Sequence, residues 1–115
     1  MAINYSVRQG VLTVNGHTVS FSFPVRTVKE MDCLLVVLLA IPFDRLVYDN
    51  VYAVDSQGEI LWQIQNAQEI FPGKNRLPYE NMMIREGKIV VSDFYGARFF
   101  VNPANGEIIG RDQVK

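Results

Sequence analysis

The chain has 115 residues, the length of a single domain, so residues 1–115 are expected to fold as one unit. Hydrophobic residues make up 49% and charged residues 20%, the balance of an ordinary globular protein with its own core. The net charge is −1 and no basic stripe stands out, which argues against nucleic acid as a partner.

The first predicted element is a hairpin. Residues 10–14 and 17–23 are rich in β-branched and aromatic side chains, and Asn15-Gly16 lies between them. Asn-Gly is a strong hairpin signal, because both turn residues must adopt a positive φ. In the second strand Val19, Phe21 and Phe23 alternate with serines. This alternation predicts one buried face and one solvent-exposed face.

Residues 25–31 are a possible further strand, and the nine residues 33–41 after it are apolar throughout. A buried helix is the alternative for 33–41, but the run is short and Pro42 closes it. We therefore expect a central strand covered on both faces. A membrane-spanning helix needs about 20 such residues, and the start of the chain does not resemble a signal peptide. These features predict a soluble, cytoplasmic protein without a membrane partner.

The second half of the chain is also predicted to be β. Residues 51–54 and 60–64 form a hairpin, and residues 66–81 form the one long irregular stretch, with room for a helical turn at 67–70. Segments 82–85, 88–92, 98–101 and 107–109 complete the strands, with turns at Glu86-Gly87 and Tyr95-Gly96 between them.

One phrase occurs twice in the chain. In residues 51–62 and again in 99–109, an apolar strand is followed by Asp or Asn, a short polar turn, Gly-Glu and a second apolar strand. Residues 87–108 resemble one blade of a quinoprotein-type β-propeller, and 51–62 resemble the second half of such a blade. The order of segments also resembles small uncharacterised bacterial β-proteins that carry the phrase Asn-Val-Tyr-Ala-Val-Asp after Ile-Pro-Phe. The resemblance implies blade-like antiparallel sheets and no particular activity.

The expected fold is therefore all-β: an antiparallel meander of about eight strands, arranged as two blade-like sheets or a partly open barrel. A closed propeller is excluded, because it typically takes four to eight blades and the chain has room for about two.

Residues that do chemistry are few and scattered. His17, the one histidine, follows a turn and is expected to be exposed, whereas Cys33 is expected to pack as a small buried hydrophobe, and a lone cysteine excludes an internal disulfide. Asp55 and Asp93 occupy turn positions, where capping explains them without a paired-carboxylate mechanism. We predict no catalytic residue, no metal and no cofactor.

The aromatic residues are the strongest candidates for a binding surface. Phe94-Tyr95 and Phe99-Phe100 are adjacent pairs, so one sheet face cannot bury them all: either both faces are covered or an aromatic patch is exposed. The candidate binding surface comprises Trp62, Tyr79, Tyr95 and Arg98.

The leading functional prediction is a non-enzymatic, protein-binding or accessory protein, and its specific version is an immunity or antitoxin-like protein that occludes another protein. The alternative is a small-molecule-binding domain or minor hydrolase that uses a cleft between the two hairpin units. A deep polar pocket containing Asp93 would favour the alternative, and a flat aromatic patch would favour protein binding. Because blade-like sheets leave strand edges open, a two-fold homodimer is also expected, with the two copies paired across a strand edge or across the Tyr95–Phe99 aromatic face.

Overall fold

Eleven strands and one short 3-10 helix make up the fold in the computed structural model, which describes residues 3–72 and 77–113. The helix, η1, is the predicted helical turn and spans Ala67–Glu69. In chain order the strands are β1 (Tyr5–Arg8), β2 (Val11–Val14), β3 (His17–Ser20), β4 (Val25–Met31), β5 (Leu34–Leu39), β6 (Val51–Asp55), β7 (Ile60–Gln63), β8 (Tyr79–Arg85), β9 (Lys88–Asp93), β10 (Ala97–Val101) and β11 (Ile108–Gln113).

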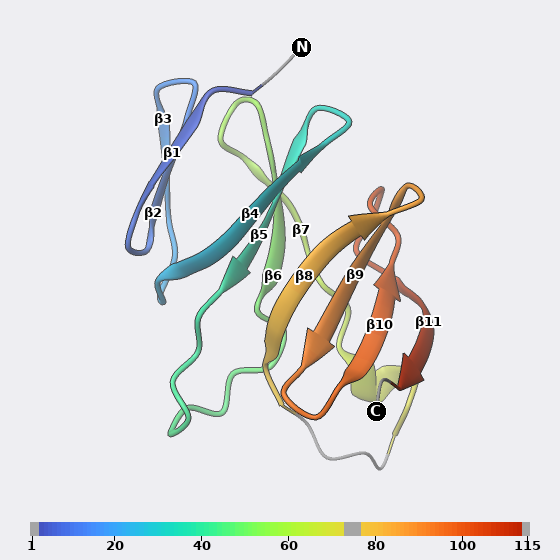
Figure 1. Cartoon of the computed structure of the whole chain (residues 1–115). Coiled ribbons are helices and arrows are strands. Elements are labelled where there is room, and N and C mark those ends of the chain that lie inside the picture. The colour runs from blue at the N-terminus through green and yellow to red at the C-terminus, as the bar shows by residue number, and fades with distance from the viewer. Residues whose placement is uncertain (1–2, 73–76, 114–115) are drawn as a thin grey trace.

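The strands form three antiparallel sheets that follow one another along the chain. The N-terminal sheet is β1-β2-β3, the central sheet is β4-β5-β6-β7, and the C-terminal sheet has β8 to β11 in the same stepwise order. Figure 1 shows them side by side, with β4 and β8, the first strands of the two larger sheets, adjacent. Among the described residues no sheet closes on itself, so the partly open barrel is wrong.

The structure has eleven strands in three sheets, so the predicted number of about eight strands in two sheets is also too low. The first hairpin does not join a larger sheet, because β1 pairs with β2 and completes a third, separate sheet. All four residues of β1 are exposed, although Tyr5 and Val7 alternate with Ser6 and Arg8 as in a half-buried strand. The hairpin's second strand is shorter than expected and ends at Ser20, before Phe21 and Phe23.

The central sheet buries both of its faces. Leu35, Val37 and Leu39 of β5 pack with Leu12 and Val14 of the N-terminal sheet. Val36 and Leu38 face the other way, into a second cluster with Ile89 and Val91 of the C-terminal sheet. Five of the six β5 side chains are buried, and the sixth, Leu34 at the start of the strand, is half-buried. The all-apolar run is therefore a central strand, as predicted.

Cys33 lies outside that strand, and the prediction that its thiol is buried is wrong. Met31 pairs with Leu34, which leaves Asp32 and Cys33 as a two-residue turn at the tip of the β4–β5 hairpin. Both have positive φ angles, 43° and 66°, and Cys33 is exposed. The other tight hairpins of this kind use Asn15-Gly16 and Glu86-Gly87, where glycine takes the second position. Cysteine therefore occupies a position that favours glycine.

Replacing Cys33 by glycine is expected to stabilise the chain by about 0.5–1 kcal/mol, because it removes the strain of a left-handed non-glycine residue. Urea unfolding under reducing conditions measures the gain. Cys33→Ser is the matched control, since it removes the thiol and keeps the strain. Equal stability of the glycine and serine variants would contradict the prediction.

The two copies of the repeated phrase contact each other. The turn between β10 and β11 lies on Trp62 of β7, whose indole Nε1 donates a hydrogen bond of 2.9 Å to the Pro103 carbonyl. The backbone N–H of Gln65 donates to the Gly106 carbonyl at 3.0 Å. The C-terminal sheet thus covers the end of the central one, and Trp62 is 9% exposed.

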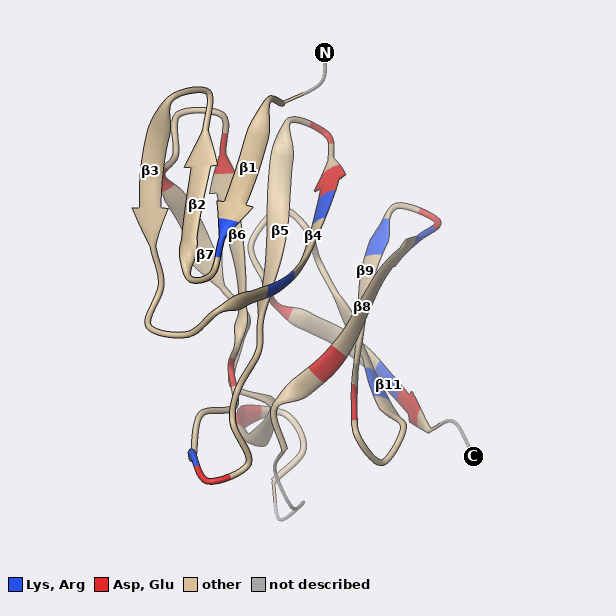
Figure 2. Ribbon diagram, turned by 60° about the vertical axis from the view of Figure 1, so that its left-hand side comes forward, with Lys and Arg blue, Asp and Glu red and all other residues tan. Residues whose placement is uncertain are grey.

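Acidic and basic residues are interspersed over the central and C-terminal sheets, whereas the strands of the N-terminal sheet carry Arg8 alone (Figure 2). Neither of the two larger sheets collects a single sign of charge along several strands, which agrees with the near-neutral sequence. Within residues 3–72 and 77–113, no helix is long and apolar enough to cross a membrane.

Candidate functional site

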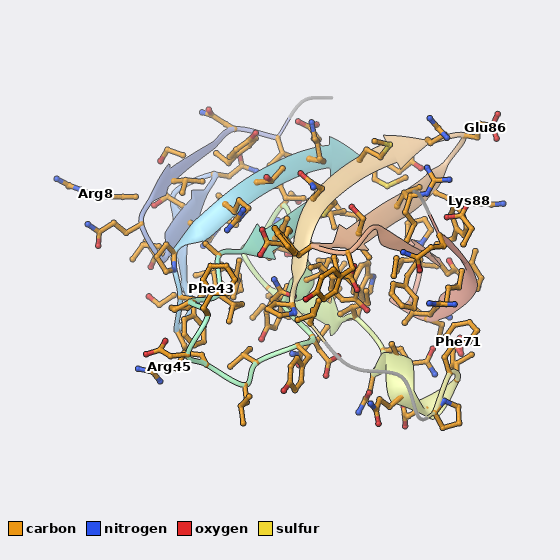
Figure 3. All side chains as sticks on the ribbon, turned by 60° about the horizontal axis from the view of Figure 1, so that its bottom comes forward. Arg8, Phe43, Arg45, Phe71, Glu86 and Lys88 are labelled. Carbon is orange, nitrogen blue, oxygen red and sulfur yellow. The ribbon has the colours of Figure 1, made fainter. Side chains whose placement is uncertain are left out.

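One wall of the candidate site is the connection between β5 and β6, residues 40–50. The strand ends at Leu39, and the chain turns at Pro42, whose carbonyl accepts a hydrogen bond from the Arg45 N–H at 3.1 Å. The turn projects Phe43 and Leu46 into solvent, with exposed fractions of 96% and 83%. Figure 3 shows Phe43 and Arg45 on this loop, at the end of the molecule that faces the viewer.

The facing wall is the turn between β9 and β10. The Asp93 carboxylate accepts hydrogen bonds from the N–H groups of Tyr95 and Ala97, both at 3.0 Å, so it fixes the turn as predicted. Phe94 and Tyr95 occupy the tip, 67% and 72% exposed, with their rings edge to face at a centroid distance of 5.5 Å. Because the Asp93 carboxylate fixes the backbone of this turn, both aromatic rings are held in solvent-exposed positions.

Asn50 fixes the position of the 40–50 loop relative to β8. Its amide nitrogen donates to the carbonyls of Leu39 and Tyr79, at 2.8 and 2.9 Å, and its amide oxygen accepts from the Tyr79 N–H at 2.9 Å. Asn50 is 1% exposed. One buried side chain therefore ties the ends of the 40–50 loop to the start of β8, which holds the site in a preformed shape.

Between the walls lies a hollow of about 270 Å³, which we call the loop-end groove. Besides the four exposed side chains above, apolar residues and two charged ones line it: Ile41, Pro42, Tyr48, Leu77, Pro78, Arg45 and Glu80. Phe43, Leu46, Phe94 and Tyr95 are the four most exposed large apolar side chains among the described residues. Exposed apolar side chains gathered in one place mark interaction surfaces.

The four residues of the predicted binding surface are not brought together. Tyr95 lines the groove. Trp62 and Tyr79 lie in the core cluster between the central and C-terminal sheets, and Tyr79 is 4% exposed. The Tyr79 ring packs edge to face on Phe99, at a centroid distance of 5.6 Å. Their aromatic rings fill the core, so they offer little surface to a partner.

Arg98 lies on the other face of the C-terminal sheet and is bound to Asp112. Its Nε and Nη2 atoms donate to the two carboxylate oxygens at 2.7 and 2.6 Å, a bidentate pair. The hydrogen bonds from Arg98 lower the pKa of Asp112. The guanidinium also lies 6.0 Å from the Phe100 ring centroid, so Arg98 organises its own sheet face and not the groove.

A second cavity lies between the C-terminal sheet and the segment that carries η1. Its volume is about 40 Å³, and its lining includes Asp93, Gln68 and Arg111. The Arg111 guanidinium lies 5.8 Å from the centroids of both the Phe71 and Phe99 rings, and its Nε atom is buried without a hydrogen-bond partner in the structure. Such a volume suits water, whereas small-molecule sites span about 300–1,000 Å³.

The residues considered for catalysis or metal binding lie outside both hollows or hold a turn together. His17 is exposed at the start of β3, as predicted. The Asp55 carboxylate accepts from the N–H groups of Gln57 and Glu59, both at 2.9 Å, and so closes its turn. Among the residues that the structure describes, no three His, Cys, Asp or Glu side chains gather in a way that could hold a metal ion.

Comparison with known proteins places the chain in a family. A family model described as "Domain of unknown function (DUF7957)" matches residues 2–113. The chain belongs to this family. No significant match is found among curated proteins.

Two solved structures are similar to this DUF7957 chain, and both are computationally designed proteins. Ika8 has 11% sequence identity and a TM-score of 0.61, and Ika4 has 12% and 0.65. The alignments cover 96% of this chain in each case, but 32% of the Ika8 chain and 66% of the Ika4 chain. The DUF7957 chain thus spans about a third of one protein and two thirds of the other, and the likeness shows the fold alone.

The binding surface predicted from the sequence omits Phe43 and Leu46, which lie in the connection between two predicted strands. A signal was present: two large apolar side chains follow a proline that ends a buried strand. Neither is needed to continue a strand, so their exposure in a loop was predictable.

Proposed function

We propose that this DUF7957 protein is a non-enzymatic protein-binding domain whose recognition surface is the loop-end groove. One observation carries the proposal: among the residues that the structure describes, the four most exposed large apolar side chains all line the same preformed hollow. A hollow of about 270 Å³ that is open to solvent has room for apolar side chains of a bound polypeptide. Aromatic anchors that lose their solvent on binding supply most of the energy at such interfaces.

The blade-like character of the two larger sheets supports the placement of this surface. Each sheet is a four-stranded meander, as in a propeller blade. The two walls are the connections between the second and third strands of their sheets, β5–β6 and β9–β10. We propose that the central and C-terminal sheets are equivalent blade-like units. Equivalent connections then emerge at the same end of the molecule, where they form one surface.

Peptides selected from a displayed random library against the full chain test the proposal, with affinity measured by fluorescence anisotropy. We expect selected peptides with aromatic or aliphatic anchors. The double substitution Phe94→Ser with Tyr95→Ser should weaken binding at least about tenfold, because hot-spot aromatics contribute more than about 1.4 kcal/mol. Both side chains are mostly exposed, so their loss should leave the fold intact.

Ile109→Ser and Leu61→Ser are the matched controls, since these side chains are 53% and 50% exposed and lie outside the groove. Neither should change peptide affinity. If the control substitutions abolish binding and the groove substitutions do not, the recognition surface lies elsewhere and the proposal is wrong.

A further inference from the structure

The loop-end groove has a shape that a copy of itself complements. Phe43 and Leu46 project from one wall, Phe94 and Tyr95 project from the other, and the hollow lies between them. An isologous interface requires one patch that carries both a projection and a matching recess. Phe43, at 96% the most exposed large apolar residue described, is such a projection beside a recess.

The charges of the groove are also self-complementary. Arg45 lies on the wall formed by the 40–50 loop, and Glu80 lies on the side formed by β8. The Glu80 carboxylate is 3.6 Å from Arg26, and its side chain remains 28% exposed. A two-fold axis that runs along the hollow places the 40–50 loop of each copy against the β8 side of the hollow in the other. Each Arg45 then approaches the Glu80 of the other copy, so the interface contains two pairs of opposite charges.

We infer that the occupant of the groove is a second copy of this chain, seated about a two-fold axis with Phe43 of each copy in the hollow of the other. The inference rests on the proposed function of the same groove. The net charge of −1 opposes association only weakly.

Other surfaces of the chain fit a second copy less well. The outward face of the N-terminal sheet carries a row of paired polar side chains, Ser6, Thr13 and Thr18, which solvent satisfies. Phe99, on the aromatic face considered from the sequence, is 8% exposed and belongs to the core. A dimer through the groove also masks the surface that binds other polypeptides, so such partners must compete with the second copy.

Sedimentation velocity on the full chain, from low to high micromolar concentration, tests the inference. We expect a species of twice the 13.1 kDa chain mass that dissociates on dilution. Phe43→Ser should raise the dimer dissociation constant at least about tenfold, whereas Leu61→Ser should not change it. Circular dichroism confirms that each variant is folded.

A charge exchange tests the two-fold geometry itself. Arg45→Glu alone brings two carboxylates together at each contact, and Glu80→Arg alone brings two guanidinium groups together, so neither variant should dimerise with itself. Mixed in equal amounts, the two variants restore an unlike pair at both contacts, and the heterodimer should form. Dimers of each single variant, or a mixture that stays monomeric, would overturn the inference.

The remaining outcomes separate this inference from the proposed function. A chain that is monomeric throughout and still binds selected peptides in the groove refutes the second copy and leaves the proposed function standing. A chain that neither dimerises nor binds peptides refutes both. A groove-binding peptide that converts dimer to monomer supports both.

Discussion

Replacing Asn50 by leucine is expected to destabilise the chain by about 3–5 kcal/mol, a large part of the roughly 5–15 kcal/mol that holds a domain folded. The Asn50 amide is the hydrogen-bond partner of three backbone groups, the Leu39 carbonyl and both the N–H and the carbonyl of Tyr79. Leucine has a similar volume and no polar atom. The substitution therefore leaves backbone groups buried without these partners, and each such group costs about 1–3 kcal/mol.

Urea unfolding monitored by circular dichroism measures the loss. Asn105→Ala is the control, because the Asn105 side chain bonds within an exposed turn, accepting from the Glu107 N–H at 3.0 Å. That variant should lose less than about 1 kcal/mol. An Asn50→Leu protein that loses no more than the control would mean that water takes over the role of the amide. Because Asn50 also ties the 40–50 loop, one wall of the groove, to β8, the leucine variant should lose peptide affinity as well.

Replacing Gly106 by alanine is expected to cost about 2–4 kcal/mol. Gly106 has a φ of +78°, where a residue with a Cβ atom is strained. The added Cβ would also lie 2.5 Å from Cε3 of Trp62, so the indole ring or the turn must move. Trp62 is held by the Pro103 carbonyl and by the core around it, which limits how far it can shift.

Gly87→Ala separates the two contributions. Gly87 has a φ of +76°, but a Cβ atom there would meet nothing within 4 Å, so only the backbone strain of about 1 kcal/mol applies. Thermal unfolding should rank the variants, and the emission of Trp62, the one tryptophan, should change in Gly106→Ala alone. Equal losses in both variants would show that the indole yields freely and that the contact is unimportant.

The parts of the fold that could be predicted from the sequence are those that depend on residues adjacent to one another in the chain. Asn15-Gly16 marks a tight turn through its own backbone preference, and the run after Cys33 marks a central strand because no other position tolerates so many apolar side chains in sequence. Asp55 and Asp93 were correctly assigned to turns, since each caps N–H groups within four residues of itself. These signals are local, and periodicity or turn chemistry is enough to detect them.

The groove escaped prediction because its walls are distant in sequence. Phe43 and Tyr95 lie about fifty positions apart and meet only because the central and C-terminal sheets pack side by side. The role of Asn50 depends on the same packing, since its partners belong to the ends of β5 and the start of β8. Trp62 was predicted to lie at an interface and is instead buried. The turn that covers it lies some forty residues further along the sequence.

The cover over Trp62 has a consequence for the order of synthesis. The central sheet is complete once β7 has left the ribosome, but the face that carries Val36, Ala53 and Trp62 packs against β8 to β11 and the turn at Gly106. A nascent chain that has reached only residue 64 therefore displays an uncovered apolar sheet surface. Translation proceeds at about 5–20 residues per second, so this state lasts several seconds. During that interval the apolar face of the central sheet is exposed and open to non-native contacts.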